Sequence, residues 1–141
     1  VVIRKKLKKQ PRKYSSADAL QSLSYVFPAT WSERRWFALL CITAGICEEA
    51  LFRGFLLQYL HSAPWNLNLT LALLLASVIF GLQHVYLGVG GVLSTTLSGI
   101  LFGLLFLLTG NLLLPMAFHA VSDLRMLLLL HPPGSEVAVS T

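Results

Sequence analysis

Charged residues are scarce in this sequence, and beyond Arg35 they nearly disappear. Only 12% of the 141 residues are Asp, Glu, Lys or Arg, whereas 55% are hydrophobic and the mean hydropathy is +0.70. Nine of the eleven Lys and Arg residues lie at or before Arg35, and only Arg53 and Arg125 follow it. A soluble domain of this size carries far more surface charge. The net charge of +5 therefore belongs to a basic arm on an apolar body, and a basic groove for nucleic acid is excluded.

Cysteine is equally rare, with Cys41 and Cys47 lying six residues apart in an apolar run. Six residues of helix rise about 9 Å, which is too far for a disulfide, because bridged Cα atoms lie within about 7 Å of each other. The sequence has no CxxC pair and no ladder of Cys and His. A disulfide scaffold and a zinc finger are thus excluded, and we expect both cysteines to be packing residues of the core.

Long apolar runs take the place of charge. Four segments approach the length of about 20 residues that a bilayer core requires. They are Trp36–Leu60, Leu67–Leu87, Val92–Leu108 and Leu112–Leu130. Short breaks separate them at His61–Asn66, Gly88–Gly91 and Gly110–Asn111. Neighbouring helices should therefore run antiparallel. The sequence predicts an all-α polytopic transmembrane bundle with about four spanning helices.

The chain divides into three parts: a basic arm with an interfacial segment at residues 1–30, an apolar core at 31–130 and a polar tail at 131–141. The arm would lie against anionic lipid headgroups on the cytoplasmic side, or would only mark that side by the positive-inside rule. Because the sequence begins at Val1 without a signal peptide, we expect it to be a C-terminal piece of a longer membrane protein, or a trimmed domain of one, with upstream helices missing.

Local signals predict where helices begin and pack. Residues Ser15–Phe27 have the pattern of a short interfacial helix. Thr30, followed three residues later by Glu33, is typical of a capping box that opens the first long helix. Gly99 and Gly103 form a GxxxG in the third span, which we interpret as a site of close helix packing rather than of dimerisation.

The first helix carries three charged residues at bilayer depth. Burying such a charge costs about +2.5 to +3.5 kcal/mol on insertion scales, so a charged residue at this depth usually has a function. Glu49 and Arg53 are four residues apart and can pair along one face. Glu48 projects about 100° further round the helix, so it is free to face a polar cavity as a general base. The alternative for Glu49 and Arg53 is a purely structural pair.

Two further helices each present one polar stripe. Phe80 and His84 share a face of the second helix at a spacing of four residues, and His119 and Asp123 do the same on the fourth. The stripes could converge inside a bundle. The alternatives are that each histidine is a hydrogen-bonded core residue, or that His119 and Asp123 form the proton relay of a transporter.

These residues form three motifs in a fixed order on successive helices: EExxxR at Glu48–Arg53, FxxxH at Phe80–His84 and HxxxD at His119–Asp123. In this order they resemble the CPBP family of intramembrane proteases, also called the CAAX protease and bacteriocin-processing or Abi family, which includes the Rce1-like prenyl-protein proteases. The resemblance covers about Ser32 to Leu130. Any one motif is weak, but the ordered set is specific.

The resemblance implies a helical membrane core whose cavity opens toward the cytoplasm and in which an activated water hydrolyses a peptide bond. Glu48 would be the general base and His84 would hold the same water. His119 and Asp123 would stabilise the oxyanion. Family members often carry Asn where this chain has Asp123. Since an ionised carboxylate cannot donate, Asp123 would instead orient His119.

The remaining motif residues would support this site: Glu49 and Arg53 would fix the helix and orient Glu48. A metal is one alternative, because Glu48, His84 and His119 could form a zinc site of two histidines and one carboxylate with an open position for water. A metal-free glutamate mechanism is the other. HExxH, the usual zincin signature, is absent, and both alternatives stay open.

The function predicted is that of an intramembrane endopeptidase in the inner or plasma membrane, with the arm and the active-site mouth on the cytoplasmic side. Its partners would be membrane lipids and a protein or peptide substrate, either prenylated or of the leader or bacteriocin type, and no nucleic acid. Two other functions compete with it. One is a non-catalytic bacteriocin-immunity or scaffold protein, since family membership does not guarantee turnover. The other is a small transporter, which the uncharged third helix disfavours.

Overall fold

The computed structural model describes residue 28 and residues 30–129, and this part of the chain is helical throughout, without a strand. A long first helix contains three sections, which are α2 (Trp31–Glu49), the π-helical segment η1 (Ala50–Leu56) and α3 (Leu57–His61). The elements that follow are α4 (Leu69–Leu82), the short 3-10 turn η2 (Val85–Leu87), α5 (Gly88–Thr109) and α6 (Leu113–Leu129). The predicted interfacial helix Ser15–Phe27 and the tail from residue 131 lie outside the described residues.

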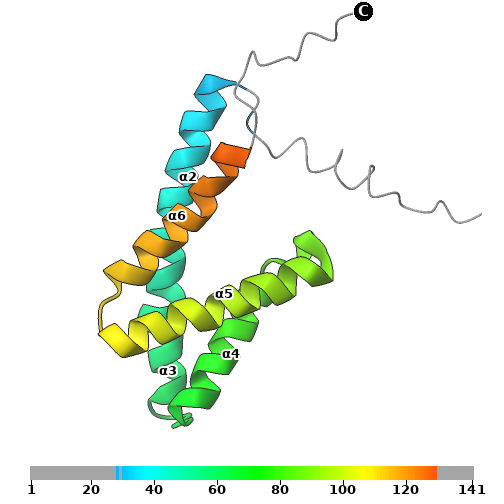
Figure 1. Ribbon diagram of the computed structural model, residues 1–141. Helices are drawn as coiled ribbons and strands as arrows, with labels where there is room; N and C mark the ends of the chain where they lie inside the picture. The colour runs from blue at the N-terminus through cyan, green and yellow to red at the C-terminus, as the bar shows by residue number, and fades with distance from the viewer. Residues whose placement is uncertain (1–27, 29, 130–141) are drawn as a thin grey trace, which may run out of the picture.

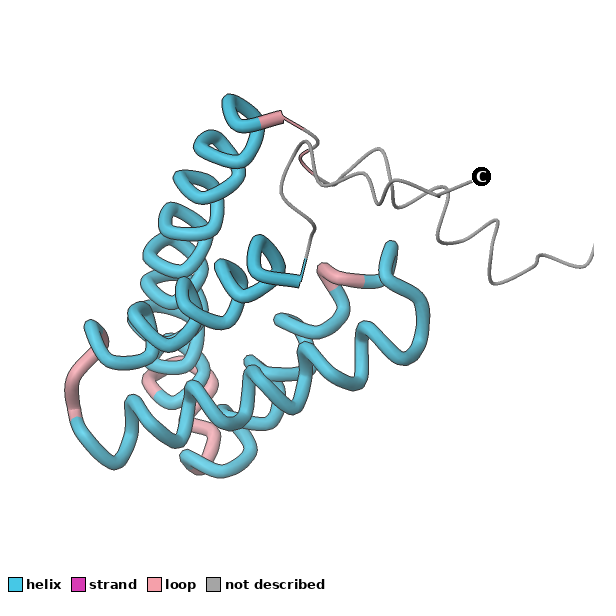
Figure 2. The backbone as a smooth tube through the Cα atoms, turned by 45° about the horizontal axis from the view of Figure 1, so that its top comes forward, coloured by secondary structure: helices cyan, strands magenta, loops and turns pink. Residues whose placement is uncertain are grey.

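The helices pack as two pairs. Along most of their length α2 contacts α6 and α4 contacts α5 (Figure 1). The first helix continues past α6 to α4 and so belongs to both pairs, as the tube in Figure 2 also shows. The connections between consecutive helices are short, as predicted. The candidate site residues therefore come from helices that meet near the middle of this arrangement.

Glycines allow the paired helices to approach closely. A Cβ on Gly45 of α2 would lie 2.8 Å from the backbone nitrogen of Ala120 and 3.0 Å from the carbonyl oxygen of Met116, both on α6. Gly99 and Gly103 of α5 are buried against α4. The interpretation of the GxxxG as a packing motif is therefore confirmed.

The capping box that was predicted at the start of the first helix is present. The hydroxyl of Thr30 accepts a hydrogen bond from the backbone N–H of Glu33 at 3.2 Å, and the Glu33 carboxylate accepts from the backbone N–H of Thr30 at 3.1 Å. The helix therefore begins at Trp31, five residues earlier than the apolar run alone indicated.

The second span ends earlier than predicted. Helix α4 stops at Leu82 and α5 begins at Gly88, so the predicted break at Gly88–Gly91 is wrong. The chain turns at residues 83–87 instead, and Gly88 adopts a φ of 74° there, which glycine tolerates without strain. The sequence did not indicate this turn, because Val85–Leu87 is apolar and continues the hydrophobic run.

The prediction that both cysteines belong to the core is right for Cys41 and wrong for Cys47. Cys41 is buried, whereas Cys47 is exposed, and both thiols are free. Six residues turn a helix by about 600°, so the two side chains lie about 120° apart and cannot share one buried face.

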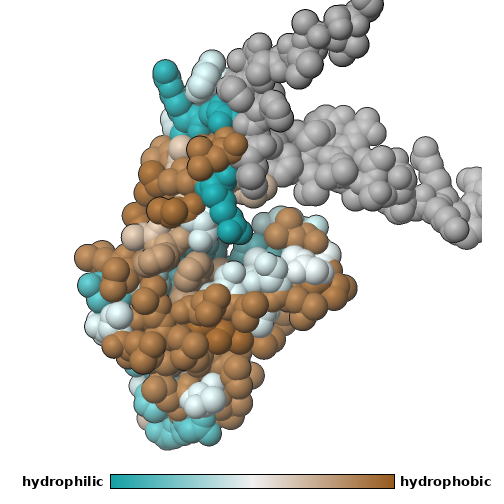
Figure 3. All heavy atoms as spheres, viewed as in Figure 1, coloured by the Kyte–Doolittle hydropathy of each residue, from teal (hydrophilic) through white to brown (hydrophobic). Residues whose placement is uncertain are grey.

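The exposed surface is largely apolar. Large hydrophobic side chains are more than half exposed on α2, α5 and α6, and Figure 3 shows hydrophobic residues over most of one face. Contiguous apolar surface of this extent is typical of contact with lipid or protein. Among the described residues, one continuous helical stretch, Val85–Thr109, is long and apolar enough to cross a membrane, and Leu69–Leu82 is apolar but shorter. Four spanning helices stay a prediction.

The close approach at Gly45 gives a stability test. Replacing Gly45 with Ala should lower the free energy of unfolding by about 1–3 kcal/mol, because the new Cβ meets backbone atoms that cannot move aside. Gly90→Ala is the matched control, since nothing lies within 4 Å of a Cβ at Gly90. Unfolding in mixed detergent micelles measures both variants. Equal stability of the two would contradict this account of the α2–α6 contact.

Candidate active site

A buried carboxylate lies at the centre of the candidate site. Glu49 is fully buried at 0% exposure, and its Oε1 accepts hydrogen bonds from Arg53 Nη1 at 2.7 Å and from His119 Nδ1 at 2.8 Å. Its other oxygen, Oε2, has no partner among the described residues. Among the described residues, Arg53 and His119 are therefore the groups that stabilise the charge of Glu49 by hydrogen bonds. The predicted Glu49–Arg53 pair is confirmed, but the bond to His119 was not foreseen.

Arg53 extends this network to a third helix. Its Nη2 donates to the carbonyl oxygen of Gly99 on α5 at 2.9 Å, and its side chain is 3% exposed. Through Glu49, Arg53 and His119, the first helix is thus bonded to both α5 and α6. Because a buried charge without partners is costly, this network restricts how the three helices can sit.

Aromatic rings enclose the network. The guanidinium carbon of Arg53 lies 4.6 Å from the ring centroid of Phe80 and 5.7 Å from that of Phe102. The imidazole of His119 stacks on Phe102 at 5.3 Å and meets Phe80 edge-on at 5.8 Å. These rings keep water from the ion pair and add cation–π attraction. Phe80 was predicted to support the site, whereas Phe102 was missed, because one more Phe in an apolar helix carries no signal.

The two acids stand directly before the π-helical segment η1. A π-helical stretch inside an α-helix is rare and frequently marks a functional site. Arg53 lies within this stretch. No residue pattern in the sequence predicted it.

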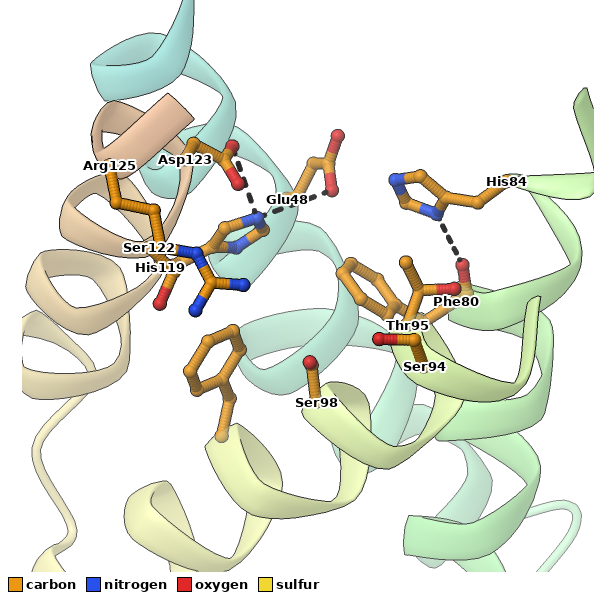
Figure 4. A pocket seen from close by; sticks show the side chains of 11 residues that line it. Glu48, Phe80, His84, Ser94, Thr95, Ser98, His119, Ser122, Asp123 and Arg125 are labelled. Carbon is orange, nitrogen blue, oxygen red and sulfur yellow. Dashed lines mark hydrogen bonds and ion pairs between the residues drawn. The ribbon is translucent and has the colours of Figure 1, made fainter. Parts of the chain in front are cut away.

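A cavity of about 160 Å³ opens beside this network (Figure 4). It is lined from α2, α4, α5 and α6 and from the turn after α4 by Glu48, Phe80, His84, Ser94, Thr95, Ser98, Phe102, His119, Ser122, Asp123 and Arg125. Five of the seven predicted site residues therefore meet at one cavity. The other two, Glu49 and Arg53, lie buried behind it.

Glu48 faces the cavity, as its angular offset from Glu49 predicted. Its side chain is 30% exposed. Its Oε2 accepts a hydrogen bond from the side-chain amide of Gln83 at 3.4 Å and lies 4.0 Å from His119 Nε2. Glu48 is thus held loosely and is open to a ligand. The contact of Gln83 with Glu48 was not predicted, because the second helix was expected to continue through residue 83 instead of ending in a turn there.

His84 does not lie on α4, contrary to the prediction, because the helix ends at Leu82. A hydrogen bond positions the ring of His84 instead, since its Nδ1 lies 3.0 Å from the carbonyl oxygen of Phe80. A carbonyl can only accept, so Nδ1 carries the hydrogen and Nε2 of the neutral ring carries a lone pair. Figure 4 shows this ring facing Glu48 across the cavity.

His119 presents its second nitrogen to the cavity. With Nδ1 bonded to Glu49, Nε2 lies 3.6 Å from Asp123 Oδ2. His119 is 6% exposed, whereas the Asp123 side chain is 41% exposed. The buried acid therefore orients the imidazole firmly, and the exposed acid contacts it weakly.

A larger and more apolar groove of about 430 Å³ adjoins the cavity. Three polar residues, Glu48, His84 and Asp123, line both spaces. The rest of the groove is formed by Phe37, Leu40, Cys41, Ala44, Tyr86, Leu87 and Met126. The polar residues thus stand where an apolar groove meets a polar cavity.

The predicted zinc ligands do not form a metal site in this structure. No three His, Cys, Asp or Glu side chains of the described residues are placed to hold one metal ion. His119 and His84 each bond Nδ1 to a protein oxygen, of Glu49 and of the Phe80 backbone respectively, and each leaves Nε2 on the cavity side. Glu48, His84 and His119 do not converge on one point in this arrangement of the described residues.

Comparison with known families gives a match over most of the chain. The model for the family "Type II CAAX prenyl endopeptidase Rce1-like" matches residues 30–125, a stretch that contains all seven predicted site residues. No curated protein and no solved structure matches the chain. The match agrees with the resemblance that the three ordered motifs indicated.

The buried network gives a second test. Replacing Arg53 with Met should lower the free energy of unfolding by about 3–5 kcal/mol, because Glu49 then keeps a buried charge without its cation. A second change, Glu49→Gln, removes that charge and should restore part of the loss. Unfolding in detergent and the yield of inserted protein measure both variants. An Arg53→Met variant as abundant and stable as the unchanged protein would contradict this role.

Proposed function

Because the chain belongs to the Rce1-like type II CAAX prenyl endopeptidase family, we propose that it is an intramembrane endopeptidase in which Glu48 activates a water. Members of this family are membrane-embedded proteases of the CAAX type, so a protein or peptide is the substrate. The observation that carries the proposed mechanism is that Glu48, His84 and His119 reach one cavity from three separate parts of the chain.

Glu48 and His84 are suited to hold one water between them. Glu48 Oε1 has no hydrogen-bond partner among the described residues, and His84 Nε2 carries a lone pair. Two acceptors can take both hydrogens of one water, which leaves an oxygen lone pair directed at the substrate carbonyl. As this oxygen attacks the carbonyl carbon, its proton passes to Glu48.

His119 would stabilise the negative oxygen that forms. Its Nδ1–H donates to buried Glu49, and a carboxylate in this position favours the imidazolium, as in a catalytic triad. The protonated Nε2 then donates to the oxyanion, and Asp123 at 3.6 Å helps to hold the ring. Glu48 gives its proton to the leaving amine as the C–N bond breaks, which regenerates the carboxylate.

The adjoining groove supports an apolar element in the substrate. Its volume of about 430 Å³ and its lining of aliphatic and aromatic side chains suit a prenyl chain or a hydrophobic peptide segment. The polar cavity would then receive the bond to be cut. We place the cavity mouth and the basic arm on the cytoplasmic side, following the positive-inside rule.

The central test is the variant Glu48→Gln. It should abolish cleavage and leave insertion and folding unchanged, because Glu48 is partly exposed and makes one long hydrogen bond. Protein termini in membranes of strains carrying the unchanged protein and Glu48→Gln give the readout. Glu33→Gln is the control, because it keeps the capping box and lies about 22 Å away along the helix. If Glu48→Gln rescued a deletion phenotype without any difference in termini, a non-catalytic immunity or scaffold role would replace this proposal.

A metal-binding test follows from the geometry of the histidines. Since the residues around the cavity do not gather three ligands, no step of the mechanism uses a metal. Treatment with EDTA and 1,10-phenanthroline should leave the cleavage rate of a fluorogenic peptide unchanged. A zinc protease treated alongside is the positive control. Loss of activity that added Zn²⁺ restores would overturn the metal-free mechanism.

A further inference from the structure

Gln83 contacts Glu48, the proposed base, but takes no part in the steps described above. Its side-chain amide lies 3.4 Å from Glu48 Oε2, and the nitrogen is the donor because an ionised carboxylate can only accept. His119 Nε2 is 4.0 Å from the same oxygen, which is beyond hydrogen-bond distance. Among the described residues, no other hydrogen bond reaches this carboxylate. The orientation of the base therefore depends on one side chain in the turn after α4.

The two oxygens of the Glu48 carboxylate have different surroundings. Gln83 donates to Oε2, whereas Oε1 has no hydrogen-bond partner among the described residues. The next residue along the chain, His84, bonds its Nδ1 to the Phe80 carbonyl, so the lone pair is on Nε2. Figure 4 shows this ring facing Glu48 across the cavity. Oε1 is therefore the oxygen that is available to a water shared with His84.

The early end of α4 lets two consecutive residues act on one carboxylate. Neighbouring residues of an α-helix project about 100° apart, so a helix that continued through residue 84 would turn one of them away from Glu48. Instead, His84 leaves helical geometry with a φ of −97° and a ψ of 20°. Its backbone N–H donates to the Gly81 carbonyl at 3.0 Å, and its carbonyl accepts from the N–H of Leu87 at 2.9 Å. Backbone hydrogen bonds thus fix the turn that carries both side chains.

The bond from Gln83 also decides which oxygen of Glu48 takes the proton. An N–H group bonds most strongly to an oxygen that carries negative charge and no hydrogen, so a proton on Oε2 would weaken this bond. When the O–H bond of the attacking water breaks, its proton is therefore placed on Oε1. The new O–H bond faces the site where the peptide C–N bond breaks, and the leaving nitrogen can take the proton from it.

We propose that Gln83 is the positioning residue of the base: it holds Glu48 Oε2, so that Oε1 takes the proton of the water and returns it to the leaving amine. This inference rests on the proposed endopeptidase function, in which Glu48 activates the water. In this role Gln83 contacts neither the water nor the substrate. It should therefore affect the rate of the chemical step and not the binding of the substrate.

The test changes residue 83 in the full chain in detergent, with an S-farnesylated fluorogenic peptide that ends in a C-a-a-X sequence. Gln83→Met has a similar length but no N–H donor, so kcat should fall about 3- to 10-fold at unchanged KM, as for loss of an ordinary hydrogen bond. Gln83→Glu keeps the shape but places a like charge beside Glu48, so its loss should be at least as large. Gln83→Lys keeps a donor and should retain a higher kcat than Gln83→Met. All values of kcat are expressed per folded protein.

Gln58→Met is the matched control, because Gln58 is exposed on α3 and its side chain makes no hydrogen bond to the described residues. It should leave kcat and KM unchanged. Full kcat in Gln83→Met would overturn the inference while the endopeptidase function stands. A kcat for Gln83→Lys as low as that of Gln83→Met would also overturn it, since packing rather than donation would then matter. No cleavage by the unchanged protein would remove the proposed CAAX-type function, and this inference with it.

Discussion

The arrangement of this protein depends on the buried carboxylate of Glu49. One oxygen accepts from Arg53 on the same helix and from His119 on α6, while Arg53 reaches the Gly99 carbonyl on α5. A buried ion pair adds little net stability, but loss of one partner is costly because the other charge stays buried. The network therefore acts mainly as a constraint, since helix positions that separate these groups are penalised. The same constraint holds His119 in one orientation at the cavity.

This constraint matters because the rest of the chain offers few directional contacts. Exposed and buried side chains are alike apolar on most helices, and hydrophobic burial is not directional. Glycines such as Gly45 and Gly99 allow the helices to pack closely. The polar network fixes how the first helix is aligned along α5 and α6. The buried network lies at the back of the cavity, and Glu48 at its front is loosely held by one hydrogen bond to Gln83. This suits the role proposed for Glu48, which is to accept and return a proton.

Periodicity and composition predicted much of this structure, and their failures have physical causes. The helical class, the capping box at Thr30, the Glu49–Arg53 pair and the direction of Glu48 all depend on spacing within one helix, which is local. The end of α4 was misplaced because an apolar 3-10 turn continues the hydrophobic pattern. The exposure of Cys47 was misjudged because α2 leaves many of its apolar side chains exposed, so an apolar position on it need not be buried.

The sequence by itself determined which chemical groups are available, their order and their spacing along each helix, since the local backbone geometry follows from neighbouring residues. Only the tertiary structure decided that Glu49 orients His119, that Phe102 covers the network and that Arg125 lines the same cavity as Glu48. These contacts join residues far apart in the chain, and they depend on helix register and rotation, which no spacing within one helix specifies.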